Sequence, residues 1–179
     1  MIVWLLLAFV IVVLLLLWRA ARTGGRLPVP GDTAPQFSLP DQDGKLRRDA
    51  EFRGRWLVLY FYPRDDTPGC AEQAARFRDA MAEIESFGAV VCGVSVDDSA
   101  SHARFAAKFR LPFTLLADRD GNTAARYGSL RDLGVVRFAR RNTFLVDPQG
   151  KVASVYAGVN PARNAQDVLA DLKRLAAAA

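Results

Sequence analysis

The sequence predicts an α/β sandwich preceded by one membrane-spanning helix. Residues 1–18 contain no charged side chain, whereas the rest of the chain mixes charges, apolar runs and turns. In that remainder, short apolar runs that suit buried strands alternate with stretches of helical spacing, which favours a sheet packed against helices. We therefore divide the chain into a transmembrane helix (1–18), a basic and Pro/Gly linker (19–30) and one domain (31–179).

The apolar segment at the N-terminus is long enough to cross a bilayer. Eighteen helical residues rise about 27 Å, close to the thickness of the hydrocarbon core. A cleaved signal peptide is the alternative, and the Ala20–Ala21 pair keeps it open, but no Lys or Arg precedes the apolar run. Positive charges follow the segment instead, so we expect a single-pass membrane protein with residues 31–179 on the cytoplasmic side. These charges are Arg19, Arg22 and Arg26.

The first half of the domain predicts a hairpin, two buried strands and a helix. An Asp-Gln-Asp-Gly turn at 41–44 separates the short segments Phe37–Leu39 and Lys45–Arg47, as in a hairpin. The apolar run 56–62 ends at Pro63 and suits a central strand buried on both faces, and 89–96 is a second such run. Between these strands, apolar residues recur at helical spacing over 70–87.

The second half repeats this alternation. Ser99 or Ser101 is expected to cap a helix, and a turn at 147–150 separates the last two strands. The whole order is compatible with a thioredoxin-like core with extra elements. The remaining elements are expected as strands at 113–117, 142–146 and 151–156, a short helix at 123–127, and a terminal helix that carries Val168, Leu169, Leu172 and Leu175.

Charge and composition exclude several classes of function. The net charge is +5, but three positive charges flank the apolar segment and the rest of the chain mixes both signs, so we expect no nucleic-acid partner. Two cysteines do not make a disulfide scaffold, and one histidine is too few for a Cys/His zinc site. We expect no metal and no cofactor, and we place His102 on a polar, solvent-exposed helix face.

Cys70 is the candidate nucleophile. It follows a buried strand and a proline-rich loop and opens a helix, where free N–H groups and the positive end of the dipole favour a thiolate over a thiol. Thr67 lies three residues earlier, close enough to place a hydroxyl beside the sulfur, and Pro63 stiffens the loop. Taken alone, this pattern leaves open that Cys70 is an ordinary small residue at a helix start. Asp65 and Asp66 are interpreted as loop charges.

The segment Phe-Tyr-Pro-Arg-Asp-Asp-Thr-Pro-Gly-Cys at 61–70 resembles the peroxiredoxins, whose signature is Pro-x-x-x-Thr/Ser-x-x-Cys. The wider match is similar to the bacterioferritin-comigratory, or Q-type, subfamily, and it covers nearly all of residues 31–175. This resemblance implies a thioredoxin-like fold of the peroxiredoxin type, with a central mixed sheet flanked by helices. The wider match includes Phe77-Arg-Asp79, Gly93–Asp97, Leu111-Pro-Phe113, Leu115–Asp118 and Arg141–Asp147.

The resemblance also implies an activity, that of a thiol-dependent peroxidase acting on hydrogen peroxide and organic hydroperoxides. Cys70 would be the peroxidatic nucleophile and would become a sulfenic acid. Thr67 would hydrogen-bond the peroxide and the thiolate, and Pro63 would shield the pocket. Arg141 matches the family's active-site arginine and would stabilise the thiolate and the leaving oxygen, although the adjacent Arg140 leaves a slip of one residue open.

The chain departs from the family pattern at Ala75, where many Q-type members carry a resolving cysteine. Cys92 is the other candidate, but its valine neighbours predict a buried strand, where cysteine is usually a small hydrophobe. We therefore expect a one-Cys mechanism with an external reductant: thioredoxin, glutaredoxin or a low-molecular-weight thiol. Gln73 fits a polar position that the family often fills with Glu or Gln.

Two other functions are weighed against the peroxidase. A membrane-anchored thiol–disulfide oxidoreductase would need a C-x-x-C motif, and Thr67 stands where its first cysteine would lie. A non-catalytic thioredoxin-fold binding module would not need Pro63, Thr67, Cys70 and Arg141 together.

Overall fold

The computed structural model describes residues 4, 9–13 and 25–177, and its centre is a five-stranded sheet in the order β5-β4-β3-β8-β9. β3, β4 and β5 run parallel, whereas β8 is antiparallel to both β3 and β9. The expected mixed sheet is therefore confirmed. Its strands are β3 (Trp56–Phe61), β4 (Ala89–Ser95), β5 (Thr114–Ala117), β8 (Thr143–Val146) and β9 (Val152–Tyr156).

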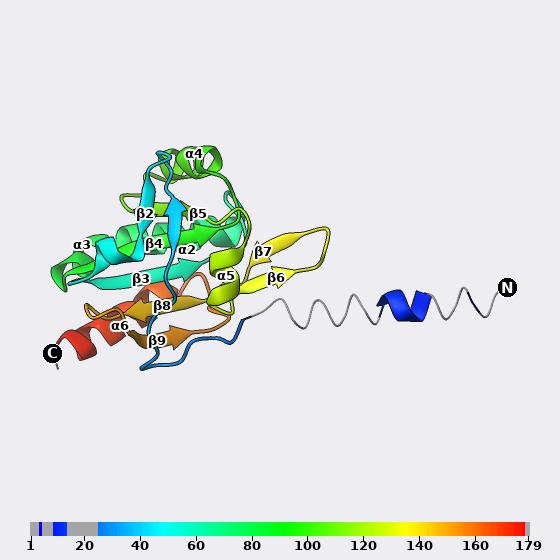
Figure 1. Ribbon diagram of the computed structural model, residues 1–179. Helices are drawn as coiled ribbons and strands as arrows, with labels where there is room; N and C mark the ends of the chain where they lie inside the picture. The colour runs from blue at the N-terminus through cyan, green and yellow to red at the C-terminus, as the bar shows by residue number, and fades with distance from the viewer. Residues whose placement is uncertain (1–3, 5–8, 14–24, 178–179) are drawn as a thin grey trace.

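Alternate residues of β3 enter two separate hydrophobic clusters, one on each face of the sheet. Val58 and Tyr60 face the first cluster, which contains residues of α2 (Pro68–Asp79), α3 (Met81–Ser86), α4 (Ser99–Phe109) and α6 (Asn164–Ala176). Leu57 and Leu59 face the second. Figure 1 shows two elements of this second face, β2 (Leu46–Arg48) and α5 (Asn122–Arg126), in front of the sheet. β1 (Ser38–Pro40) and η1 (Asp49–Phe52) also contribute residues to the second cluster.

Two helices differ from their predicted form. The helix expected over 70–87 is split at Ala80 into α2 and α3, and α2 begins at Pro68, where a missing N–H costs no hydrogen bond. Helix α4 is capped by Asp98 rather than by either serine, because the Asp98 carboxylate accepts a hydrogen bond from the Ser101 N–H at 2.8 Å.

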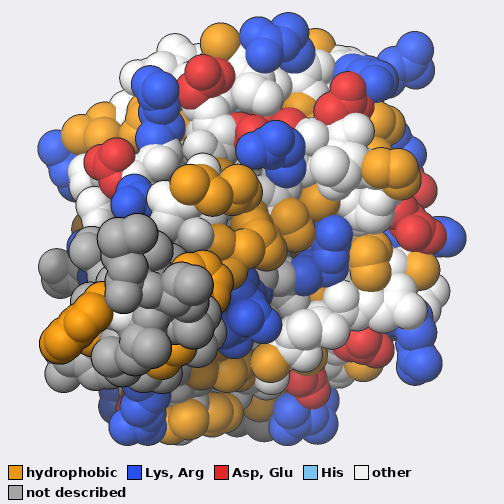
Figure 2. Space-filling model, turned by 90° about the vertical axis from the view of Figure 1, so that its right-hand side faces the viewer, with side chains coloured by type: hydrophobic (Ala, Val, Ile, Leu, Met, Phe, Trp, Pro, Cys, Tyr) orange, Lys and Arg blue, Asp and Glu red, His pale blue; other side chains and the backbone are white. Residues whose placement is uncertain are grey.

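A further hairpin was not predicted. Strands β6 (Leu130–Asp132) and β7 (Arg137–Ala139) pair antiparallel and project from one side of the fold. Three-residue strands with Arg and Asp in them carry too little alternation for a sequence signal. Val135 at the turn is 95% exposed. Figure 2 looks onto this side, where hydrophobic side chains lie among Lys and Arg.

The N-terminal predictions are only partly covered by the structure. Of the expected transmembrane helix, only Trp4 and residues 9–13 are described, and the rest of 1–18 lies outside the described residues. Within the part of the chain that is described, no helix is long and apolar enough to cross a membrane. The end of the expected linker rests on the domain, since the Gly25 N–H donates to Ala125 O at 3.1 Å and Leu27 packs on the second cluster.

Candidate active site

Cys70 is the third residue of α2, and the chain around it enters the helix in a defined way. Thr67 is the N-cap residue with extended backbone angles, and Pro68 follows at the first helical position. The Cys70 N–H donates to the Thr67 carbonyl at 3.0 Å. This donor is therefore occupied, whereas the sequence analysis expected the N–H groups at the helix start to be free. The Cys70 side chain is 1% exposed and lies in the first cluster with Tyr60 and Tyr62. The sulfur therefore lies at the positive end of a helix dipole and packs against hydrophobic side chains of the first cluster.

Arg141 reaches this sulfur from the chain segment before β8. Its Nη2 lies 3.4 Å from Cys70 Sγ, and its Nη1 donates to Gln73 Oε1 at 2.7 Å and approaches Gly69 O at 3.4 Å. Gly69 allows this approach, because a Cβ there would lie 3.3 Å from Nη2. Of the two neighbouring arginines, Arg141 lies beside the sulfur and Arg140 is exposed.

A buried chain of polar groups fixes the guanidinium. Gln73, which is 0% exposed, donates from Nε2 to Asn164 Oδ1 at 2.8 Å, and the same oxygen accepts from Thr143 Oγ1 at 2.8 Å. Asn164 thereby orients the Gln73 amide so that its oxygen faces Arg141. The sequence analysis anticipated Gln73 but not Asn164 or Thr143. A polar residue at the buried start of an apolar helix face was the available signal for Asn164.

The other two predicted site residues lie beside Cys70, but neither touches the sulfur. The Thr67 hydroxyl donates to Arg64 O at 3.2 Å, and no hydrogen bond from it to Cys70 is present among the described residues. The expected contact between Thr67 and the thiolate is therefore not seen in this structure. Pro63 is half-buried and lies two residues after the end of β3, in the loop that leads to Cys70.

Two residues that were assigned to solvent are buried together. His102 is 0% exposed and its Nδ1 lies 2.8 Å from Asp65 Oδ2, so the predicted exposed histidine is wrong. Asp65 is 7% exposed and also accepts from the Tyr62 hydroxyl at 2.7 Å. Burial raises the pKa of Asp65, but the hydrogen bond and charge of His102 outweigh it and hold that pKa below its ordinary value. Helical spacing alone did not reveal this, because the partner comes from a loop 37 residues away in sequence.

Cys92 lies on the other side of the sheet from Cys70. It belongs to the second cluster, with Leu59 and Val94, and its side chain is 1% exposed. Burial raises the pKa of its thiol to about 12. Cys92 is therefore a small apolar core residue in this structure, and both cysteines are free thiols.

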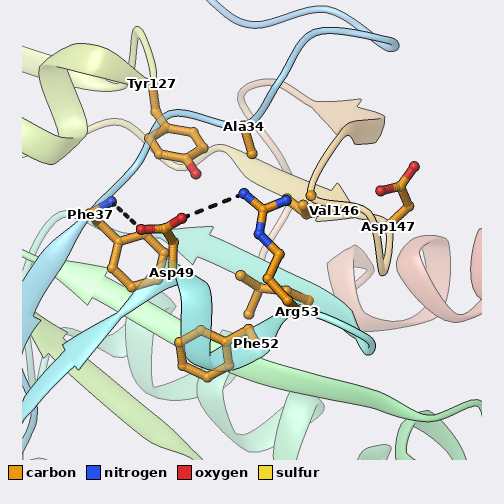
Figure 3. Close-up of a pocket in the computed structure, with 10 residues that line it drawn as sticks. Ala34, Phe37, Asp49, Phe52, Arg53, Tyr127, Val146 and Asp147 are labelled. Carbon is orange, nitrogen blue, oxygen red and sulfur yellow. Dashed lines mark hydrogen bonds and ion pairs between the residues drawn. The ribbon is translucent and has the colours of Figure 1, made fainter.

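A small cavity lies away from Cys70, against the second cluster (Figure 3). Its volume is about 20 Å³, enough for roughly one water molecule. Asp49 and Arg53, whose charged groups are 3.6 Å apart, line it together with the rings of Phe37, Phe52 and Tyr127. Its size and its place on the opposite face exclude it as the substrate site for Cys70.

Comparison with known proteins agrees with this geometry. Residues 30–155 match the AhpC/TSA family. The chain is 45% identical over 141 residues to a chloroplastic peroxiredoxin Q of Triticum aestivum, covering 77% of this chain and 64% of that protein. It is 39% identical over 135 residues to a putative peroxiredoxin bcp of Coxiella burnetii, covering 72% of this chain and 88% of that protein.

A solved structure shows the same fold. It is the bacterioferritin comigratory protein of Xanthomonas campestris, described for its alkyl peroxide reduction activity. The TM-score is 0.75 at 33% identity, over 85% of this chain and 99% of that chain.

These relatives differ from the chain in extent and correct one prediction. The chain spans 64% of the wheat protein, just under two thirds of its length. The predicted single-pass membrane location, with the domain on the cytoplasmic side, is contradicted: the wheat relative is named as chloroplastic, and the described residues contain no membrane-spanning helix. With a family match over 30–155 and the fold expected for it, the chain belongs to the AhpC/TSA family of peroxiredoxins and is similar to its Q-type, bacterioferritin-comigratory members.

Proposed function

We propose that the chain is a thiol-dependent peroxidase with Cys70 as its nucleophile, and that residues 31–179 form its catalytic domain. One observation carries this proposal: the Arg141 guanidinium lies 3.4 Å from the Cys70 sulfur, in the first turn of a helix. A cationic donor in that place favours a thiolate, which is the nucleophilic form of cysteine.

The reaction has two halves. The Cys70 thiolate attacks the terminal oxygen of a peroxide, ROOH; a sulfur–oxygen bond forms, the O–O bond breaks, and the leaving alkoxide takes a proton to give ROH. The product on the protein is Cys70 sulfenic acid. An external thiol then attacks that sulfur, releasing water and forming a mixed disulfide, and a second thiol frees Cys70. Per cycle, two thiols are oxidised to one disulfide and one peroxide is reduced.

The surrounding residues divide the work. Arg141 stabilises the thiolate and the negative charge that develops on the departing oxygen. Gln73 and Asn164 hold the guanidinium in that position. Pro63 and Thr67 complete the loop around the sulfur, and a short rotation of the Thr67 hydroxyl away from the Arg64 carbonyl would offer it to a bound peroxide.

The reductant is external because the chain offers no suitable internal thiol. Position 75 is alanine, and Cys92 lies in the cluster on the opposite face of the sheet. Burial raises the pKa of Cys92 to about 12, so its thiol is protonated at neutral pH and is a poor nucleophile. Thioredoxin, glutaredoxin and low-molecular-weight thiols are the candidate donors. Hydrogen peroxide and organic hydroperoxides are the proposed substrates, supported by the alkyl peroxide activity described for the Xanthomonas campestris relative.

The test is peroxide consumption by the full chain in the presence of each donor system, beside Cys70→Ser and Cys92→Ser variants. We expect turnover in the wild type and in Cys92→Ser, and none in Cys70→Ser. A wild-type chain that does not consume even one equivalent of peroxide per molecule would refute the peroxidase. Loss of turnover in Cys92→Ser, with single-turnover oxidation intact, would refute the external reductant.

A further inference from the structure

The cluster of His102, Asp65 and Tyr62 takes no part in the proposed chemistry, yet it is as buried as the core. Asp65 accepts two hydrogen bonds, from His102 Nδ1 at 2.8 Å and from the Tyr62 hydroxyl at 2.7 Å. Each of the three side chains is at most 7% exposed. Burying a carboxylate is costly unless its oxygens are satisfied, so this arrangement holds Asp65 firmly in place.

Asp65 belongs to the loop that leads into the helix of the catalytic cysteine. Residues 63–67 of this loop, which joins β3 to α2, are also anchored by the Asp65 N–H, which donates to Asp97 Oδ2 at 2.9 Å, and by the Asp66 carboxylate, which pairs with Lys108 Nζ at 2.6 Å. The next residue, Asp66, has a φ of 59°, in the left-handed region that non-glycine residues rarely adopt. Such a conformation persists only where neighbouring contacts enforce it. The buried contacts at Asp65 therefore help to fix the path of the chain into the first turn of α2, beside the exposed ion pair of Asp66 with Lys108.

His102 donates through one ring nitrogen only. Because the Asp65 carboxylate accepts the bond, the proton lies on Nδ1. Its Nε2 is buried and has no hydrogen-bond partner among the described residues. Nδ1–H is therefore the ring donor that holds Asp65.

We propose that His102 is a positioning residue for Cys70: through Nδ1–H it holds Asp65, and with it the 63–67 loop, in the arrangement that keeps Cys70 closed against Arg141. This deepens the proposed function and rests on it for its kinetic consequence. Peroxide attack needs the closed arrangement, since Arg141 must reach the sulfur. Reduction by an external thiol needs an opening, because Cys70 is 1% exposed. Helix α4, through His102, sets the balance between the two.

Two substitutions distinguish the roles of the two ring nitrogens of His102. The amide nitrogen of Asn lies near the position of Nδ1, whereas that of Gln lies near Nε2. His102→Asn therefore keeps the donor to Asp65 and His102→Gln displaces it. Arg104→Ala, an exposed change on the same helix, is the matched control.

The readout is the rate at which an alkylating reagent modifies each cysteine of the folded full chain. Cys92 serves as an internal control, because it is buried on the other face and becomes reactive only on global unfolding. We expect His102→Gln to speed alkylation of Cys70 by at least about tenfold while Cys92 stays unchanged, and to slow single-turnover oxidation of Cys70 by peroxide by about tenfold. His102→Asn and Arg104→Ala are expected to match the wild type.

Equal effects of Asn and Gln, or a parallel rise in Cys92 alkylation, would overturn the proposal.

A second measurement needs no variant. His102 is the sole histidine of the chain, so in an NMR spectrum the imidazole ¹⁵N signals can belong only to this residue. We expect a proton on Nδ1, and a ring protonated only at Nε2 would overturn the assignment. If the wild type proved inert to peroxide, the peroxidase would fail while alkylation and tautomer still decided the role of His102.

Discussion

Replacement of Arg141 probes the proposed chemistry most directly. Its Nη2 lies 3.4 Å from Cys70 Sγ. At that separation, two unit charges in an effective dielectric of about 20 interact by about 5 kcal/mol. The guanidinium is half-buried, so solvent screens part of this energy. We therefore expect Arg141→Ala to lose about 3–4 kcal/mol of transition-state stabilisation, in line with the removal of one charge-stabilising donor from other active sites.

The assay is a single turnover. The reduced chain is mixed rapidly with peroxide, the remaining thiol is trapped by alkylation, and the rate constant follows from its dependence on peroxide concentration. Arg141→Ala is expected to lower this rate constant by about 10²–10³-fold. Arg141→Lys keeps the charge but loses the forked guanidinium that reaches both Cys70 Sγ and Gln73 Oε1. Its rate constant is therefore expected to lie between those of the wild type and Arg141→Ala.

The neighbouring Arg140 supplies the matched control. It is exposed, and its backbone N–H, which a substitution retains, donates to Ser129 O. Arg140→Ala is expected to oxidise at the wild-type rate. The reasoning fails if Arg141→Ala stays within about threefold of the wild type, or if the loss appears in Arg140→Ala instead.

Three further predictions concern the cysteines, the packing and the acid stability. Cys92→Ala is expected to leave the rate of Cys70 oxidation unchanged, and peroxide-treated wild type should show no internal disulfide by mass spectrometry; a loss of 2 Da, about two hydrogens, would contradict this. Gly93→Ala should lower the stability by about 1–3 kcal/mol in urea, because its Cβ would lie 2.7 Å from the Tyr60 ring; an unchanged midpoint would show that the ring moves freely. The depressed pKa of Asp65 contributes stability above its unfolded value of about 4, and this is lost as the pH falls through the lower folded-state pKa. The difference in unfolding free energy between wild type and Asp65→Asn should therefore shrink below about pH 4, and a difference that grew would have the wrong sign.

The sequence predicted the local structure correctly where the residues that determine it are contiguous in one segment. The apolar run of β3, the loop with Pro63 and the helix start at Cys70 are contiguous, so their roles in the fold could be predicted. Contacts between distant segments could not. Asp65 and His102 each look like solvent-exposed residues locally, and only the packing of α4 beside the loop brings them together. Asn164 likewise acquires its place from the approach of α6 to α2.

The position of the two cysteines supports the proposal of an external thiol reductant. Tyr60, in the cluster that contains Cys70, and Leu59, in the cluster that contains Cys92, are neighbours in β3 whose side chains point to opposite faces of the sheet. Cys92 pairs with Leu59 in the parallel ladder between β3 and β4, so it shares that opposite face. A small movement of α2 cannot carry Cys70 around the sheet, and moving Cys92 to the other face would shift the register of β4 and turn its whole buried side outward. An internal disulfide would thus require the central strands to separate, whereas an external thiol requires only that the loop before Cys70 open.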